Sequence, residues 1–187
     1  SEMCIRDRRG HNVVAVLSAQ GDTTDDLIAK AAEINPHASK REMDMLLSTG
    51  EQISCSLCAM AVEAMGLPVV SLTGWQAGVQ SNSSYGNARI NRIVTERILT
   101  ELDRRCIVIV TGFQGINKYG DITTLGRGGS DTSAVALAAS LHADLCQIYT
   151  DVDGVYTADP RLVPGAHKLD EITFDEMLEL SLIHISE

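Results

Sequence analysis

The sequence predicts an α/β fold, a three-layer sandwich in which a mainly parallel sheet is covered by helices on both faces. Two observations support this prediction. Short apolar runs rich in branched residues recur along the chain, as in strands that are buried on both sides. Helical patterns lie between these runs, and strands joined by right-handed helical crossovers form a parallel sheet that binds its ligands at the carboxyl ends of the strands.

Four apolar runs predict the strands of this sheet. They cover residues 13–17, 68–72, 106–112 and 145–149, and each is followed by polar or glycine-containing residues that favour a turn. The longest stretch between elements, residues 73–86, contains three glycines and three serines and is predicted to be a loop.

Five helical patterns alternate with these runs. Thr24 is expected to cap the first helix, and Ser130 or Asp131 the fourth, because their side-chain oxygens accept hydrogen bonds from free N–H groups. Gly66-Leu67-Pro68 is expected to end the second helix, and a capping-box pattern starts the fifth at Thr173. The predicted helices cover residues 25–33, 42–65, 89–104, 134–142 and 173–180.

Composition narrows the class of protein. With 187 residues, 44% of them hydrophobic, the chain is long enough for one domain with one substantial core. A net charge of −10 argues against nucleic acid and anionic membrane surfaces as partners. An apolar stretch of roughly 20 residues and a signal sequence are both missing, and the five cysteines are odd in number. We therefore expect a soluble cytoplasmic protein that acts on small molecules.

The segment richest in chemistry is Thr124-Leu-Gly-Arg-Gly-Gly-Ser-Asp131, which precedes an apolar helix. Free N–H groups at a helix start bind phosphate or carboxylate, and glycines let the ligand approach the backbone. Arg127 offers a planar fork that suits a carboxylate, and Asp131 accepts from an amine. The alternative is a tight turn with a capped helix and a solvated arginine. The sequence contains no Gly-x-x-x-x-Gly-Lys-Ser/Thr motif, so it does not match a P-loop, and Asp131 stands where a dinucleotide-binding fingerprint would need its third glycine.

Two further segments could contact ligands. Residues 148–161 leave a predicted strand through an Asp-Gly turn, and Tyr156 and Arg161 there could contact adenine, ribose or phosphate, although an ordinary turn is the alternative. This segment lacks the further oxygen ligands of a calcium loop. Residues 43–54 place Gly50 and Glu51 inside an apolar helix, which indicates either a binding position or a helix that restarts at Ser48 through a capping box.

The cysteines and histidines predict no metal site. Cys55 and Cys58 lie in a helical pattern without a second ligand pair at zinc spacing, so we interpret them as core thiols. The five histidines show neither a ligand pattern nor a catalytic triad pattern.

Several segments together resemble the amino-acid kinase family, and within it the aspartate kinases. The resemblance extends from about Val13 to Leu180, with the motifs in the family's order. Long motifs in register are far less expected by chance than any single short pattern. The segments that carry it are residues 18–27, 43–54, 73–78, 123–131 and 149–161.

This resemblance implies transfer of a phosphoryl group from ATP to the side-chain carboxylate of L-aspartate, the entry step of lysine, threonine and methionine synthesis. It implies that Arg127 binds a substrate carboxylate and Asp131 lies near the α-amino group, as the two catalytic residues. It also implies Mg²⁺ on the phosphates and a homo- or hetero-oligomer at full length. The implied substrate-binding residues are Ser18, Thr24, Glu51, Arg127, Ser130 and Asp131, and the implied nucleotide-binding residues are Thr150, Asp151, Tyr156, Asp159, Pro160 and Arg161.

The resemblance also implies a domain that is incomplete at both ends. We expect residues 10–181 to form a partial catalytic domain, and residues 1–9 and 182–187 to be non-native. The family's opening loop, whose lysine contacts the transferred phosphate, has no counterpart before Val13, and the C-terminal ACT domains are absent. Two alternatives stay open: a catalytically inactive nucleotide- or amino-acid-binding module, and a related kinase for another acid such as acetylglutamate, glutamate or UMP.

Overall fold

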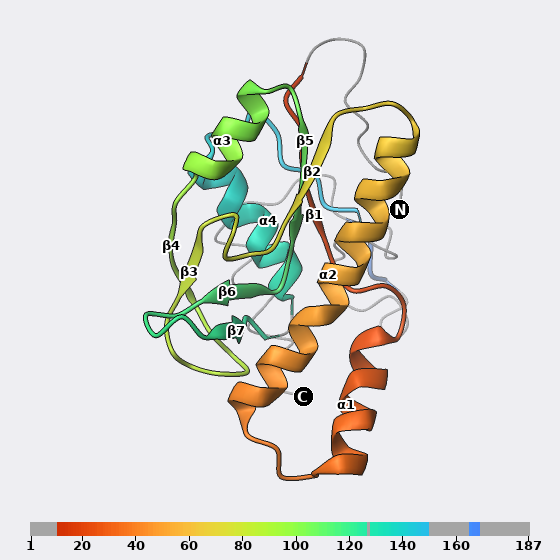
Figure 1. The fold of residues 1–187 in the computed structure, drawn as a ribbon, viewed down its shortest axis with the longest axis vertical. Helices are drawn as coiled ribbons and strands as arrows, with labels where there is room; N and C mark the ends of the chain where they lie inside the picture. Colours follow the sequence, from red (N-terminus) through yellow and green to blue (C-terminus); the bar gives the residue numbers. More distant parts are fainter. Residues whose placement is uncertain (1–10, 127, 150–164, 169–187) are drawn as a thin grey trace. The chain divides into compact units, whose positions relative to one another are not determined.

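The computed structural model describes residues 11–126, 128–149 and 165–168 (Figure 1). The chain divides into two compact units, one of residues 2–148 and one of Ser1 with residues 149–187. All the helices and strands described below belong to the first unit.

A parallel sheet of three strands forms the centre of this unit. Its order is β1 (Val14–Leu17), β5 (Ile107–Thr111) and β2 (Val69–Leu72), and both pairs are parallel. These strands confirm three of the four predicted apolar runs. Since strands far apart in the sequence pair here, the connections between them have to cross over the faces of the sheet.

Helices cover both faces of this sheet (Figure 1). Successive side chains of a strand point to opposite faces, so β5 contributes to two separate cores. Ile107 and Ile109 pack under α2 (Lys40–Ala64) with Cys55 and Val62. On the other face, a second core joins β5 to α3 (Glu96–Asp103) and α4 (Gly129–Ser140) and contains the side chains of Leu72, Ala77, Ile98, Leu102, Val108, Val110 and Leu137. The predicted three-layer α/β sandwich is confirmed.

Two predicted helix caps are wrong. Helix α1 (Thr23–Ile34) begins one residue before Thr24, because the Thr23 hydroxyl donates to the carbonyl of Gln20 (2.6 Å) and closes the turn earlier. Helix α4 has Gly128 at its N-cap, and the left-handed backbone of this glycine (φ +67°) turns the chain straight into the helix. Ser130 and Asp131 therefore lie in the first turn instead of capping it.

Helix α2 is continuous, which excludes the alternative of a helix that restarts at Ser48. The Ser48 hydroxyl donates to the carbonyl of Met45 (2.8 Å) within the helix and does not cap a new one. Gly50 is tolerated because α2 passes close to the turn after β1: a Cβ atom at Gly50 would lie 2.9 Å from the Ala19 side chain. The helix ends before Gly66 (φ +75°), as predicted.

By length and composition alone, α2 could also cross a membrane. Its buried residues, however, include Asp44, Ser48 and Glu51 as well as Cys55 and Val62. A helix that directs two carboxylates and a hydroxyl into its own protein is a covering helix of the core, because lipid offers such groups no partners.

A second sheet was not predicted from the sequence. It has four strands in the order β4 (Ile90–Ile93), β3 (Val79–Ser81), β6 (Gln114–Ile116) and β7 (Ile122–Thr124). The predicted helix over residues 89–104 is therefore wrong in its first part, and the predicted loop over residues 73–86 contains β3. These short strands lack the apolar runs that mark β1, β5 and β2, and their pairing with distant segments decides their conformation.

The fourth predicted strand, residues 145–149, is also wrong. These residues belong to neither sheet, and Leu145 is 71% exposed and Tyr149 54% exposed. An apolar run becomes a strand only where another strand pairs with it, and the sheet formed by β1, β5 and β2 does not include this segment. The predicted helix at residues 173–180 lies outside the described residues.

A close backbone contact at Gly78 predicts a large loss of stability on substitution. Gly66 and Gly78 both have positive φ (+75° and +81°), but a Cβ atom at Gly78 would overlap the carbonyl of Val94, whereas Gly66 has open space. Gly66→Ala should cost roughly 1–2 kcal/mol for the left-handed backbone. Gly78→Ala should cost about 2 kcal/mol more, since backbone has to move. Urea unfolding of both variants measures the difference, and equal losses would contradict the overlap.

Candidate active site

The carboxyl edge of the parallel sheet brings together the turn after β1, the end of β5 and the start of α4. The N–H of Gly112, just beyond β5, donates to the carbonyl of Leu17 at the end of β1 (3.0 Å). Gly112 also lies directly against Ser130: a Cβ atom there would be 2.6 Å from the Ser130 hydroxyl oxygen. Ligands bind at this edge in open α/β sheets, as predicted from the sequence.

Helix α2 adds a buried carboxylate to this edge. The Glu51 side chain is 3% exposed, and its Oε1 accepts a hydrogen bond from the N–H of Ala19 (3.2 Å). Its Oε2 is buried and has no hydrogen-bond partner among the described residues. Burial raises the pKa of Glu51 above its usual value, because the charged form loses its water. A buried carboxylate oxygen without a partner is costly, and a bound cationic group would offset that cost.

Two more buried polar atoms lie on the α2 side of β5 and β6. Thr111 shares the strand parity of Ile107 and Ile109, which pack under α2, and its hydroxyl has no partner among the described residues. The Gln114 amide donates to the carbonyl of Ser48 in α2 (2.9 Å). Its Oε1 atom has no hydrogen-bond partner among the described residues. The interface between α2 and the carboxyl edge is thus polar rather than apolar.

The backbone of the loop from β7 into α4 is suited to the close approach of a ligand. Phe113 (φ +67°) holds it at both ends: its carbonyl accepts from the N–H of Leu125 (2.8 Å), and its N–H donates to the Ser133 hydroxyl (3.1 Å). Gly126 and Gly128 both have positive φ. The loop ends at the start of a 12-residue helix, where free N–H groups attract anions.

The structure brings several predicted site residues to this edge. Ser18 is exposed at the end of β1, next to Ala19, which bonds Glu51. Ser130 lies against Gly112, and exposed Asp131 follows it in the first turn of α4. Thr24 is half-buried in the first turn of α1, beside Thr23, whose methyl group lies near Gly50. The remaining predicted site residues lie outside the described residues: Arg127, Thr150, Asp151, Tyr156, Asp159, Pro160 and Arg161.

Sequence reasoning missed Asp44. This carboxylate is 1% exposed and connects α2 to Thr124 at the end of β7. A signal was present, because Asp44, Ser48 and Glu51 recur at intervals of four and three residues, which places three polar side chains on one face of an otherwise apolar helix.

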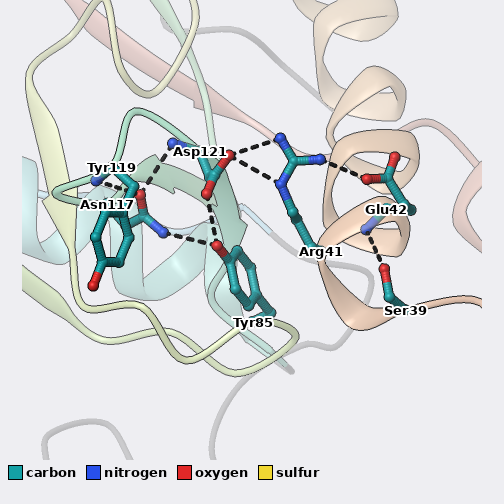
Figure 2. A network of polar contacts seen from close by, with 7 residues as sticks. All are labelled: Ser39, Arg41, Glu42, Tyr85, Asn117, Tyr119 and Asp121. Carbon is teal, nitrogen blue, oxygen red and sulfur yellow. Dashed lines mark hydrogen bonds and ion pairs between the residues drawn. The ribbon is translucent and has the colours of Figure 1, made fainter.

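A network of partly exposed polar contacts joins the start of α2 to the hairpin of β6 and β7 (Figure 2). Asp121 accepts two hydrogen bonds from the Arg41 guanidinium (2.8 and 3.0 Å) and one from the Tyr85 hydroxyl (2.7 Å). Asn117 accepts from the N–H of Tyr119 and donates to Tyr85. The hydrogen bond from Tyr85, followed by that from Arg41, lowers the pKa of Asp121, so this carboxylate stays charged.

The described residues contain no group of three or more His, Cys, Asp or Glu side chains that could hold a metal ion. Cys55 is buried in the core under the sheet, and burial raises the pKa of its thiol to about 12. This cysteine is therefore an unreactive core residue, as predicted.

Comparison with known proteins identifies the class. Residues 4–185 match the model of the Amino acid kinase family, and the chain belongs to this family. The resemblance inferred from the sequence is confirmed.

The curated relatives that the chain matches include aspartokinases. The Geobacillus stearothermophilus aspartokinase is 60% identical over 93% of this chain and 43% of its own length. The Corynebacterium glutamicum aspartokinase is 58% identical over 94% of this chain and 42% of its own length. The chain thus spans less than half the length of these curated relatives.

Two solved structures support the same assignment of the fold. The crystal structure of aspartate kinase from Synechocystis is 50% identical, with a TM-score of 0.76 over 94% of this chain and 29% of that one. Aspartokinase III from E. coli, crystallised in complex with aspartate and ADP, is 34% identical, with a TM-score of 0.73 over 86% of this chain and 37% of that one.

The raised pKa of Glu51 predicts how stability depends on pH. The folded state holds this proton more tightly than the unfolded chain, whose glutamate pKa is near 4.5. The contribution of Glu51 to the free energy of unfolding therefore falls as pH rises from about that value through the raised folded pKa. Glu51→Gln removes the titrating group, so the variant should gain stability relative to the parent chain as pH rises from 4 to 7.

Urea unfolding at several pH values measures this gain. Glu63→Gln, at an exposed position of the same helix, is the control for the change in charge. A difference between Glu51→Gln and the parent chain that stays constant from pH 4 to 7 would rule out the buried, proton-retaining carboxylate.

Proposed function

We propose that the protein phosphorylates the side-chain carboxylate of L-aspartate with ATP, which gives ADP and 4-phospho-L-aspartate. Membership of the Amino acid kinase family and the likeness to aspartokinases support this proposal. The observation that carries it is Glu51, a buried carboxylate with one unpaired oxygen at the carboxyl edge of the sheet. Such a group suits a substrate that carries an ammonium.

Aspartate carries two carboxylates and one ammonium, and the proposed site has a complement for each. Glu51 and Asp131 would face the ammonium, because both are acidic side chains at this edge. Arg127 and the N–H groups at the start of α4 would bind carboxylate. Ser18, Thr24 and Ser130 would complete the contacts through their hydroxyls, which both donate and accept.

The reaction needs no general base in this proposal. The side-chain carboxylate of aspartate is ionised at neutral pH and can attack the γ-phosphorus directly, in line with the leaving ADP oxygen. The enzyme then has to position the substrate and to stabilise the charge on the transferred group. The N–H groups at the start of α4 and the Arg127 side chain would contribute to that task.

The nucleotide would bind to Thr150, Asp151, Tyr156, Asp159, Pro160 and Arg161. Mg²⁺, when bound between the phosphates, would neutralise part of their charge. We further propose that the protein is cytoplasmic and works as a homo- or hetero-oligomer at full length. Free cysteines in the described part of the chain fit a reducing compartment.

The reaction can be tested directly on the full-length protein that carries this chain. ADP release is followed with L-aspartate, glutamate, acetylglutamate or UMP, and hydroxylamine traps an acyl phosphate as a hydroxamate. Aspartate-dependent ADP release with an equal amount of hydroxamate is the expected result. Turnover with another acid alone would assign a different substrate. Binding of ATP and aspartate in calorimetry without turnover would indicate an inactive binding module.

Arg127 provides a sharper test of the site. Arg127→Ala should lower kcat/KM for aspartate by about 100-fold or more, since a charge-assisted, two-pronged contact with a carboxylate is lost. The unfolding midpoint should not change. Arg92→Ala, at an exposed position of β4, is the matched control and should retain activity. Near-normal turnover of Arg127→Ala would remove Arg127 from the site.

A further inference from the structure

Asp44 makes an unusually complete set of contacts for a buried carboxylate. Its two oxygens accept from the N–H of Gly86 (3.0 and 2.9 Å), from the N–H of Thr124 (3.1 Å) and from the Thr124 hydroxyl (2.7 Å). The side chain is 1% exposed. Asp44 therefore joins three segments that are distant in the sequence, namely α2, the loop before β4 and the end of β7.

Hydrogen bonds from Gly86 and Thr124 compensate the burial of this carboxylate. The ion pairs among the described residues include other carboxylates of the unit but not Asp44. Donors to an ionised acceptor form short and strong hydrogen bonds, so a carboxylate with several of them is both satisfied and fixed in orientation. Loss of this side chain would remove the acceptor of the Gly86 N–H and leave the buried donors of Thr124 without this partner.

The contacts lie where the loop from β7 into α4 (residues 125–128) begins, which we call the substrate loop. Thr124 is the last residue of β7 and precedes Arg127 by three positions. Its carbonyl accepts from the N–H of Ala88 (2.8 Å), and Gly126 lies against the side chain of Asn87. Residues 86–88 and 124–126 are thus held together, with Asp44 bonded to both segments.

Asp44 and Glu51 lie on the same face of α2. Seven residues separate them, which is about two turns or roughly 10 Å along a helix axis. One rigid helix face therefore carries the buried acid of the site at one point and the attachment for the loop into α4 at the other. The separation between Glu51 and that loop depends on where Asp44 holds β7.

We propose that Asp44 is a positioning residue, which fixes the loop that carries Arg127 and leads into the first turn of α4 with Asp131, relative to Glu51, and so sets the geometry of the substrate site. This inference rests on the proposed function for its substrate, but not for its structural step. Asp44 touches no reacting atom; it acts through Thr124 and Gly86.

A second connection between α2 and the hairpin offers a natural control. Arg41 bonds Asp121 at the other end of β7 (Figure 2), but the Arg41 side chain is 49% exposed. Exposed ion pairs of this kind contribute little to stability because water and salt compete for them. Arg41→Gln should therefore leave the substrate loop in place, although it removes a contact between the same two elements.

The test measures KM for each substrate in the full-length protein. Asp44→Asn should raise KM for L-aspartate at least tenfold and change KM for ATP less than twofold. An amide in place of the carboxylate cannot accept from all the donors that Asp44 accepts from. Thr124→Val, which removes only one hydroxyl, should cause a smaller increase. Thr124→Ser keeps this hydroxyl, so its KM for L-aspartate should stay within twofold of the parent value. Arg41→Gln should likewise leave KM for L-aspartate within twofold of the parent value.

Amide hydrogen exchange in the absence of substrate tests the structural step by itself. Asp44→Asn should speed exchange at Gly86, Thr124 and residues 125–131, and leave the amides of β5 unchanged. Thr124→Val serves the same comparison if Asp44→Asn does not fold. Unchanged exchange in this loop, or faster exchange with unchanged KM for aspartate, would overturn the proposal. Absence of aspartate turnover in the parent would defeat the proposed function instead, and the exchange experiment would still decide the role of Asp44.

Discussion

Strand β5 is buried on both of its faces, and this constraint organises the described unit. All five of its residues are buried, with alternate side chains in two different cores. β1 and β2 flank it, α2 lies over one face, and α3 and α4 lie over the other. Because both faces are covered, polar groups can gather only where the strand ends. The candidate site lies at that end, where Gly112 and Phe113 lead the chain into β6.

Helix α2 buries polar groups that a core-covering helix would normally exclude. A covering helix that served the core alone would bury only apolar side chains, yet α2 also buries Asp44 and Glu51. The two carboxylates differ in how many of their oxygens accept hydrogen bonds. Asp44 is bonded to several donors, as expected of a group that holds structure, whereas Glu51 keeps one oxygen unpaired. Proteins commonly retain such locally unfavourable groups at functional sites, where a ligand compensates them.

Much of the fold was predictable because its signal is local. The three paired apolar runs, the end of α2 at Gly66 and the alternation of strands and helices all follow from composition and periodicity. The second sheet, the strand over Ile90–Ile93 and the start of α4 at Gly129 were not predictable in this way. The strands of the second sheet depend on pairing with segments far away in the sequence and lack the apolar runs of β1, β5 and β2. The start of α4 depends on the left-handed backbone of Gly128. Residues 145–149 show the converse, because their apolar run lacks a place in either sheet.

By itself the sequence determined the family and the three-layer class, and it predicted the residue types of the candidate site, since ordered motifs carry that information in one dimension. Only the tertiary structure decided that Glu51 is buried with one oxygen unpaired, that Ser130 lies against Gly112, and that Asp44 joins α2 to β7. The physical reason is that burial and hydrogen-bond satisfaction belong to pairs of groups that are far apart along the chain. Their energies exist only once the three layers have brought these groups together.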